Sequence, residues 1–317
     1  MDRVQKILQY ECLHRSGYKG DGIGIALVDT GVSYHQDLAS RVVAFKDFVN
    51  GRNEAYDDNG HGTHIAGILA GNGAMSEGKY VGIAPEANLY VCKCLDHKGN
   101  GFFDSAIKAF QSIRSDKSQY NIRLINVSIG GELIENDNRQ SYFLEEVRKL
   151  WQEGFIVVAA AGNGGPKRHT ITVPGCVKEI ITVGSIFENQ GNPYSGNGPT
   201  KNCIVKPEVV APGTGIISCS NKGASYSPLS GTSMAAPIVT GSIALLLQKY
   251  PYLSNKEVKK LLLFTCRDLG IETNSQGWGM INPIGLLMCS PQLACRHKIT
   301  NSLIEILENY SNQKRIG

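Results

Sequence analysis

The chain has 317 residues, of which 42% are hydrophobic and 36 are glycines, and its formal net charge is +4 at pH 7. This composition is typical of a globular domain with an ample core and argues against a disordered chain. The lysines and arginines are scattered, and no apolar stretch approaches the roughly 20 residues of a membrane span, so we expect neither nucleic acid nor a membrane as a partner.

The start of the chain and its cysteines predict a cytoplasmic protein. Residues 1–10 include Asp2, Arg3, Gln5 and Lys6 and lack the apolar core of a signal peptide. The nine cysteines are an odd number, which is more typical of reduced thiols than of a disulfide framework. Cys92 and Cys94 alternate on a predicted strand, where we expect small buried side chains rather than metal ligands.

Short runs rich in Val and Ile alternate with helical patterns along the chain. The predicted strands cover residues 23–28, 89–94, 122–127, 155–160 and 179–183. The predicted helices cover residues 63–70, 104–117, 141–152 and 234–250. The strands lack clean polar alternation, as expected of parallel strands that are buried on both faces. The pattern indicates an α/β fold with a central, mostly parallel sheet flanked by helices.

Three polar segments at the ends of these runs contain Asp, His and Ser in that order. They are Ala26–Gly31 with Asp29, Asn59–His64 with His61, and Ser230–Pro237 with Ser233. A serine hydroxyl is a poor nucleophile at neutral pH, so it needs a base to take its proton and a carboxylate to orient that base. Ser233, His61 and Asp29 are the candidates for these three roles.

The sequences of these segments resemble those of the subtilisin-like serine proteases, the subtilase family, and in particular of its intracellular-type members. Asp-Thr-Gly after an apolar strand, His-Gly-Thr-His at a helix start and Gly-Thr-Ser-Met-Ala-Ala-Pro are each long enough to be rare by chance. The family has the same Asp, His, Ser order. The resemblance implies the subtilisin-like three-layer fold and a serine endopeptidase that forms an acyl-enzyme intermediate.

The same resemblance assigns an oxyanion hole. The segment Val157–Gly165 is similar to the family segment that presents a side-chain amide, here that of Asn163. Attack on a peptide carbonyl places negative charge on its oxygen, and losing one preplaced donor costs roughly 3–4 kcal/mol. The backbone N–H of Ser233 would be the second donor.

Substrate-binding residues follow from the resemblance as well. Ser128, Ile129 and Gly130 match the strand that lines the primary specificity pocket, and Gly99, Asn100 and Gly101 match the strand that pairs with an extended peptide. Ala160 and Gly162 are assigned to the same binding cleft. Asp29, Ser128 and Asn163 each follow a predicted strand, so we expect them at one edge of the sheet. The expected substrate is a polypeptide.

The loop from Gly164 to Pro174 is expected to close the primary pocket. It contains the basic run Lys167, Arg168 and His169, and such runs usually lie on solvated loops. We therefore predict a preference for large apolar residues at the position before the cleaved bond, called P1, rather than for acidic residues.

The resemblance divides the chain into three parts: an N-terminal extension (1–16), the peptidase domain (17–286) and a C-terminal helical extension (287–317). Ser254 and Glu257 have the spacing of a capping box at the start of the last family-like helix. In the C-terminal extension, an apolar stripe is expected to pack on the domain or to form a dimer contact; it consists of Ile299, Leu303, Ile306, Leu307 and Tyr310. The sequence leaves the oligomeric state open.

The reaction itself needs no cofactor, and a structural calcium ion is the one metal to consider. Asp37 matches a family position that helps to hold such an ion. The loop of residues 72–80, from which further oxygen ligands would come, differs from the family pattern. Calcium requires about six to eight oxygen ligands, which the sequence does not supply in an identifiable set.

Other interpretations of the same residues stay open. His61 and His64, three residues apart, with Asp29 would make a metal site for a metallohydrolase, but Ser233 would then have no role. A catalytically silent relative would hold a peptide in the same cleft, and a processing protease would cut one precursor peptide. An esterase is disfavoured because Gly231–Ala235 lacks the second glycine of a nucleophile elbow.

Overall fold

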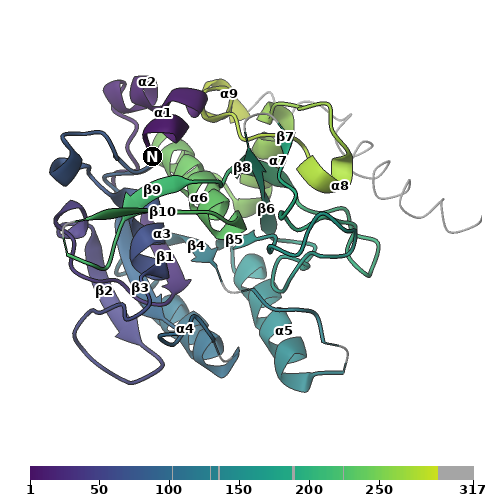
Figure 1. Ribbon diagram of the computed structural model, residues 1–317, viewed down its shortest axis with the longest axis horizontal. Coiled ribbons are helices and arrows are strands. Elements are labelled where there is room, and N and C mark those ends of the chain that lie inside the picture. Colours follow the sequence, from purple (N-terminus) through teal and green to yellow (C-terminus); the bar gives the residue numbers. More distant parts are fainter. Residues whose placement is uncertain (102, 129, 135, 188–189, 224, 292–317) are drawn as a thin grey trace, which may run out of the picture.

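The structure is a computed structural model that describes residues 1–291 apart from positions 102, 129, 135, 188–189 and 224 (Figure 1). At its centre lies a twisted sheet of eight strands within this described part. They are β1 (Gly24–Asp29), β2 (Val42–Asp47), β3 (Asn88–Lys93), β4 (Ile122–Val127), β5 (Ile156–Ala160), β6 (Ile181–Phe187), β7 (Gln190–Gly191) and β8 (Val209–Pro212).

The strands are ordered β2-β3-β1-β4-β5-β6, with both β7 and β8 pairing with β6. Every pair is parallel except β6 with β7. All residues of β1 and β5 are buried, because helices cover both faces of a parallel sheet. The α/β fold expected from the sequence is confirmed.

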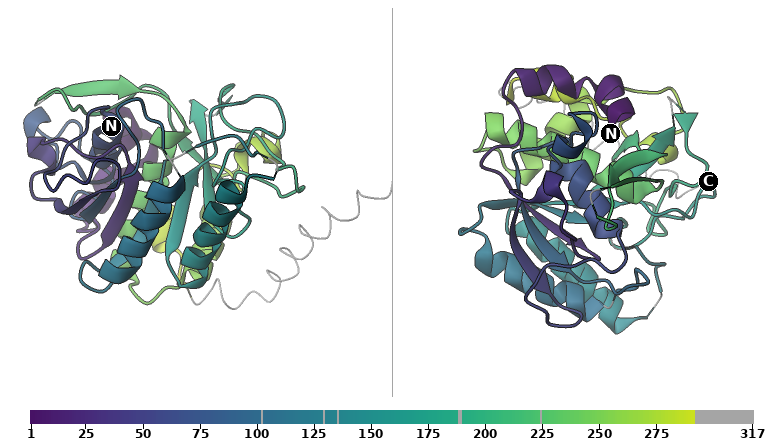
Figure 2. Two further views of the ribbon diagram at one scale, coloured as in Figure 1. Left: turned by 90° about the horizontal axis from the view of Figure 1, so that it is seen from below. Right: turned by 60° about the vertical axis from the view of Figure 1, so that its left-hand side comes forward.

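Helices form a layer on each side of the sheet (Figure 2). The helices α3 (His61–Ala70) and α6 (Thr232–Lys249) pack against each other on one face, and α4 (Phe103–Asp116) and α5 (Asn138–Gln152) pack against each other on the other face. The predicted apolar faces of α4 and α5 are buried through Ile107, Phe110, Val147 and Trp151. These contacts fix where the strand ends and helix starts of the site lie.

Shorter elements complete the described chain. They are α1 (Asp2–Leu8), α2 (Tyr10–Arg15), η1 (Gln36–Leu38), η2 (Ala74–Ser76), β9 (Ile216–Cys219), β10 (Tyr226–Leu229), α7 (Asn255–Thr265), α8 (Thr273–Gln276) and α9 (Pro283–Met288). β9 and β10 form a separate antiparallel pair. α7 begins with the predicted capping box between Ser254 and Glu257.

The central strand β1 is the point at which the sheet order reverses. Its neighbours β3 and β4 lie on opposite sides of it, and ligands of open parallel sheets bind beyond the carboxyl ends of strands at such a point. Asp29 is the last residue of β1, Ser128 directly follows β4, and Asn163 follows β5 by three residues. The predicted shared edge is therefore present.

Residues 1–16, which the sequence predicts to be an N-terminal extension, pack against the rest of the described chain. Tyr10 Oη lies 2.6 Å from Ser242 Oγ in α6, and the ring of His14 is bonded to Ile83 O at 2.9 Å. The apolar stripe predicted in the C-terminal extension falls outside the described residues. No helix in the described part of the chain is long and apolar enough to span a bilayer.

Candidate active site

Asp29 and His61 meet where β1 ends and α3 begins. Asp29 is fully buried, and its Oδ1 accepts hydrogen bonds from His61 Nδ1 at 2.7 Å and from Thr30 N–H at 2.7 Å. With a proton on Nδ1, the neutral imidazole has its lone pair on Nε2. The carboxylate therefore sets the ring orientation and leaves Nε2 available as a base.

Two features bring the start of α3 against the end of β1. A Cβ atom at Gly62 would lie 2.1 Å from Gly31 O, so this close backbone approach requires glycine. Thr30 Oγ1 accepts the Gly62 N–H and donates to Asp57 Oδ1, both at 2.8 Å. His61, the first residue of α3, is thereby held next to Asp29.

Asp57 is a buried carboxylate that caps this helix start. It accepts the N–H groups of Gly60 at 2.8 Å and Thr63 at 2.9 Å, and the Thr63 hydroxyl at 2.6 Å. Burial raises the pKa of Asp57, but these hydrogen bonds outweigh it and hold the pKa below its ordinary value. Asp57 thus stays ionised and orders the loop that carries His61. Sequence reasoning missed Asp57, because it lies outside the N-cap position of α3, which Gly60 takes.

The environment of His61 favours its protonated form. Burial lowers the pKa of the ring, but the charge and hydrogen bond of Asp29, together with the charge of Asp57, outweigh burial and raise the pKa above the ordinary value. A base with a raised pKa is better able to take the proton of a serine hydroxyl.

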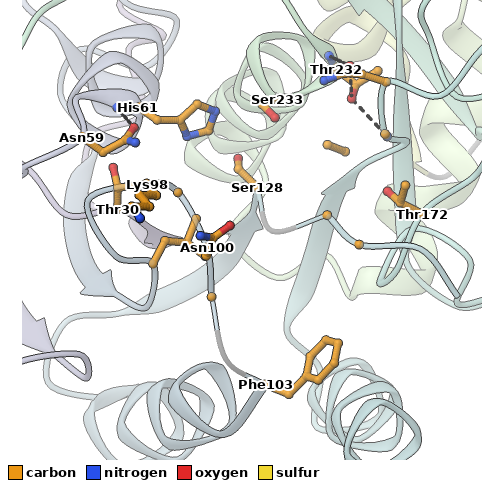
Figure 3. Close-up of a pocket in the computed structure, with 18 residues that line it drawn as sticks. Thr30, Asn59, His61, Lys98, Asn100, Phe103, Ser128, Thr172, Thr232 and Ser233 are labelled. Carbon is orange, nitrogen blue, oxygen red and sulfur yellow. Dashed lines mark hydrogen bonds between the residues drawn. The ribbon is translucent and has the colours of Figure 1, made fainter. Parts of the chain in front are cut away.

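Ser233 is the second residue of α6, where backbone N–H groups have no partner within the helix. Its side chain and that of His61 line the same cavity and lie at the same end of it (Figure 3). No hydrogen bond joins these two described side chains, and such contacts often tighten only when substrate is bound. The helix N-terminus favours negative charge beside the serine.

Asn163 is oriented by the residue before the serine. Its Oδ1 accepts the Thr232 backbone N–H at 3.0 Å and the Thr232 hydroxyl at 3.2 Å. A backbone N–H can only donate, so the amide oxygen of Asn163 must face it and the Nδ2 group is left for the cavity. Thr232 Oγ1 also accepts the Gly162 N–H at 3.1 Å, which ties α6 to the segment after β5.

The cavity has a volume of about 540 Å³ and brings together most of the residues predicted from the sequence. His61, Asn163 and Ser233 line it, as do Ser128, Gly130, Gly99, Asn100, Gly101, Ala160 and Gly162. Asp29 lies beneath His61 and is not part of the wall. Ile129 falls outside the described residues.

Gly131 and Thr172 also line the cavity and belong to segments that were expected there, the pocket strand and the loop from Gly164 to Pro174. Further lining residues were not predicted: Thr30, Asn59, Leu95, Lys98, Phe103 and Thr232. Leu95 and Gly101 form an antiparallel bridge that shapes one side, and Gly131 and Val173 form another on the opposite side. Such contacts depend on the folded chain and leave no local sequence signal.

The basic run of the loop from Gly164 to Pro174 lies in solvent, as expected. Lys167, Arg168 and His169 are exposed, and none of them lines the cavity. Arg168 forms an ion pair with Glu272 at 2.5 Å. The loop reaches the cavity through Thr172 instead.

A buried lysine links three loops of the site. Lys93 is fully buried beside Asp29 in the β1–β3 pairing. Its Nζ donates to Thr30 O at 2.7 Å, to Leu95 O at 3.0 Å and to Asp58 Oδ1 at 2.6 Å. Thr30 follows β1, Leu95 follows β3 and Asp58 precedes His61. One ammonium group therefore connects the segment after Asp29, the loop that leads to residues 99–101 and the loop that carries His61.

Cys92, Cys94 and His64 are buried residues with a structural role. Cys92 and Cys94 are buried, as predicted, and burial raises the pKa of both thiols. His64 Nε2 contacts Ile216 O at 2.9 Å and Ser227 O at 3.0 Å, and burial lowers the pKa of the ring to about 4. Since both partners are acceptors, Nε2 carries the proton and is not free for a metal.

The surroundings of Asp37 do not suit calcium. Its Oδ1 accepts the Met75 N–H at 2.9 Å and its Oδ2 accepts the Tyr226 hydroxyl at 2.6 Å. Among the His, Cys, Asp and Glu side chains of the described residues, only His35 and Cys219 join Asp37 in a metal-like group. Calcium prefers six to eight oxygen ligands, and a nitrogen and a sulfur are poor substitutes.

The family model described as the subtilase family matches residues 20–279. The chain is 40% identical over 268 residues to serine protease AprX of Bacillus subtilis (strain 168), covering 77% of this chain and 61% of AprX, which is less than two thirds of that protein. It is 34% identical over 281 residues to subtilisin DY of Bacillus licheniformis, covering 87% of this chain and 94% of that protein.

Solved structures agree with the sequence comparisons. Sphericase superimposes with a TM-score of 0.73 at 29% identity, covering 83% of this chain and 91% of sphericase. The S41 psychrophilic protease superimposes with a TM-score of 0.71 at 30% identity, covering 83% of this chain and 91% of that chain. The family match, the fold and the arrangement around Asp29, His61 and Ser233 lead to one conclusion: the chain belongs to the subtilase family.

Proposed function

We propose that the chain is a serine endopeptidase. The observation that carries the proposal is the 2.7 Å bond between buried Asp29 and His61 Nδ1, at a cavity that Ser233 and Asn163 also line. The bond leaves Nε2 of His61 available as the base, and the N-terminus of α6 places the Ser233 hydroxyl beside its own backbone N–H.

The reaction follows from these positions. Ser233 Oγ attacks the peptide carbonyl carbon while His61 Nε2 takes the hydroxyl proton. Asn163 Nδ2 and the Ser233 N–H stabilise the oxyanion, and Asp29 stabilises the imidazolium. Collapse of the intermediate breaks the C–N bond as His61 gives its proton to the leaving amine. A water molecule then attacks the acyl-enzyme carbonyl while His61 accepts a proton from the water. When the second intermediate collapses, His61 returns this proton to Ser233 Oγ, and the carboxylic acid product leaves.

The proposed substrate is an extended polypeptide that lies between residues 99–101 on one side and Ser128, Gly130 and Gly131 on the other. Backbone pairing on both sides accepts any extended chain, and pockets select side chains. Support for a broad preference for large apolar P1 residues comes from the neutral wall near Ser128, Gly130 and Ala160 and from the solvent position of the basic loop. An acidic P1 profile would contradict this preference.

The proposed chemistry uses no metal or other cofactor. His64 Nε2 is engaged by two backbone carbonyls and His61 Nδ1 is bonded to Asp29, which supports a serine mechanism over a metal held by these three residues. We further propose a cytoplasmic location, because the eight cysteines of the described residues are all unpaired thiols. Cell fractionation with antibody detection tests the location, and recovery in a secreted fraction would contradict it.

The test compares the chain with its Ser233→Ala variant, using a fluorophosphonate probe and an unstructured protein substrate with and without a chelator. We expect labelling and cleavage that disappear in the variant and survive the chelator. Cleavage without labelling that stops on chelation would instead support a metallohydrolase. Absence of both would support a catalytically silent peptide-binding relative, and cleavage restricted to one sequence would support a processing protease.

A further inference from the structure

The rim of the cavity carries one permanent charge that the proposed reaction does not use. Among the described residues that line the cavity, Lys98 is the only Lys, Arg, Asp or Glu. Its side chain is exposed, and it forms no ion pair with another described residue. Figure 3 shows Lys98 beside Thr30, on the side of the cavity where Asn59 and His61 lie and away from Thr172. The ammonium group is therefore available to a bound substrate.

The turn that carries Lys98 is held close to the proposed catalytic base. Asp96 Oδ1 accepts the Lys98 N–H at 2.8 Å, which fixes the backbone of the turn. Asn59 Nδ2 donates to His97 O at 3.1 Å, and Asn59 Oδ1 accepts the His61 N–H at 3.1 Å. One asparagine side chain thus connects the turn with the start of α3. The backbone of Lys98 stays near His61, while its long side chain keeps its freedom in solvent.

The carboxylates of the neighbouring segments already have partners. Hydrogen bonds from the backbone N–H groups of Asn100 and Lys98 hold the pKa of Asp96 below its ordinary value, so this carboxylate is ionised and bound to its own turn. Asp58 forms its ion pair with buried Lys93 at 2.6 Å. An anion that pairs with Lys98 therefore has to come from outside these segments, and the substrate is the molecule that enters here.

The alternation of side chains along an extended chain decides which substrate residue meets Lys98. Successive side chains of an extended strand point to opposite faces. A substrate that pairs with residues 99–101 places its P1 side chain at the neutral wall near Ser128 and Ala160. The side chain of the residue before P1, called P2, then points to the other wall, which contains His61 and Lys98. P2 is therefore the position at which this charge acts.

We propose that Lys98 is a specificity-determining residue that favours an acidic residue, glutamate or aspartate, at P2. The ammonium group forms an ion pair with the P2 carboxylate at the rim of the cavity. Both groups stay partly hydrated there, so the pair forms without the desolvation cost of a buried one. A lysine or arginine at P2 is repelled. This inference rests on the proposed function: it adds a charge preference at P2 and leaves the P1 preference unchanged.

Two isomeric peptides test the proposal on the full chain. One has Glu at P2 and Gln at P5, and the other has Gln at P2 and Glu at P5. Both have at P1 the residue after which the chain most often cuts an unstructured protein. Because composition and net charge are equal, a difference in kcat/KM reports the position of the carboxylate. We expect kcat/KM to be about three- to fivefold higher with Glu at P2, and the ratio to approach one at about 1 M salt, where charges are screened.

Variants of two lysines assign the effect to its residue. Lys98→Gln should make the two peptides equal substrates, and Lys98→Glu should reverse their order. Lys108→Gln is the matched control, because Lys108 is an exposed lysine of α4 that does not line the cavity, and the ratio should stay as in the unmodified chain. An equal fall of the ratio in Lys98→Gln and Lys108→Gln overturns the proposal.

Fluorophosphonate labelling separates the two levels of inference. Labelled enzyme that cleaves both peptides equally well at low salt overturns the role of Lys98 alone. Absence of labelling and of all cleavage overturns the proposed peptidase and this inference with it.

Discussion

Lys93 forms a 2.6 Å ion pair with Asp58, and the two residues differ sharply in exposure: the lysine side chain is fully buried, whereas that of Asp58 is 39% exposed. The remaining two hydrogen bonds of Lys93 go to the backbone oxygens of Thr30 and Leu95, both in loops of the site. The ring of Tyr56 lies 4.8 Å from Nζ and adds a cation–π contact. The main role of the Lys93 ammonium group is therefore to hold the backbone of two site loops, and its ion pair with the half-exposed Asp58 is secondary.

Replacing Lys93 should weaken both folding and catalysis. Lys93→Met leaves two buried carbonyls without donors, at about 1–3 kcal/mol each in the free energy of unfolding. Displacement of the loops that carry Asp29 and His61 should lower kcat roughly tenfold or more. Urea unfolding of an inactive Ser233→Ala background and steady-state kinetics of the single variant measure these two effects.

Asp58→Asn is the matched control for Lys93, because it removes the charge pair and leaves both carbonyl bonds intact. Because Lys93 is fully buried, loss of this carboxylate should lower the free energy of unfolding by up to about 3–5 kcal/mol, whereas kcat should change little because both carbonyl bonds still hold the loops. A folded Lys93→Met variant with unchanged kcat would contradict the positioning role, as would an Asp58→Asn variant that is equally impaired.

The amide of Asn163 should matter for kcat far more than for KM. Asn163→Asp is nearly isosteric and keeps an oxygen toward Thr232, but it places a second oxygen where Nδ2 stood. We expect kcat to fall about 100- to 1,000-fold with KM almost unchanged, because the lost donor acts on the oxyanion and not on the ground state.

Thr232→Val tests how the amide is held. The variant loses the hydroxyl contacts with Asn163 Oδ1 and Gly162 N–H but keeps the backbone bond to Asn163, so a roughly fivefold loss of kcat is expected. Steady-state kinetics on one peptide measure both variants. A change confined to KM would point to substrate binding instead of transition-state stabilisation.

Both carboxylate oxygens of Asp37 accept hydrogen bonds, from the Met75 N–H and from the Tyr226 hydroxyl. We expect the Tm of the Ser233→Ala protein to be the same with EDTA as with added calcium. Tyr226→Phe removes a hydrogen bond to a buried carboxylate and should cost about 1.5–3 kcal/mol of stability. Tyr34→Phe, at a tyrosine that is 80% exposed, is the control and should have no effect. Calcium-dependent melting would refute the prediction.

His64 should make the folded protein less stable in acid. Its folded pKa is lowered to about 4 by burial, below the ordinary 6.5, so the unfolded chain binds the proton first as the pH falls. The free energy of unfolding therefore begins to fall near pH 6.5, and the decrease approaches roughly 3 kcal/mol near pH 4. His64→Gln offers an amide donor to the same carbonyls and does not titrate. Urea unfolding in the Ser233→Ala background should show a smaller pH slope with glutamine, and equal slopes would contradict the assignment.

Local patterns were sufficient to predict the main strands and helices and the segments of the triad. The Val and Ile runs indicated β1, β3, β4 and β5 to within a residue at each end. β2 was missed because its apolar run ends in the polar residues Lys46 and Asp47. β9 and β10 were missed because strands of only four residues, the first mostly buried and the second half-exposed, give little local signal. Pairing partners, not local composition, define these strands.

The residues around the triad were harder to predict because their roles depend on long-range contacts. Lys93 lies in a run of strand formers and looks like a solvated side chain until its three oxygen partners are placed around it. Thr232 precedes the serine, yet its function depends on Asn163, 69 residues away.

The raised pKa of His61 predicts the acid limb of the activity profile. His61 must be neutral to take the Ser233 proton, so activity is lost as the pH falls through its pKa. Burial lowers this pKa, but the Asp29 charge outweighs it, and the limb of kcat/KM should therefore lie above pH 6.5. Asp29→Asn removes the charge and should move the limb to lower pH, with a rate roughly 10⁴-fold smaller that remains measurable by fluorophosphonate labelling. If the acid limb of the pH profile lies at the same pH in Asp29→Asn, the titrating group is not His61.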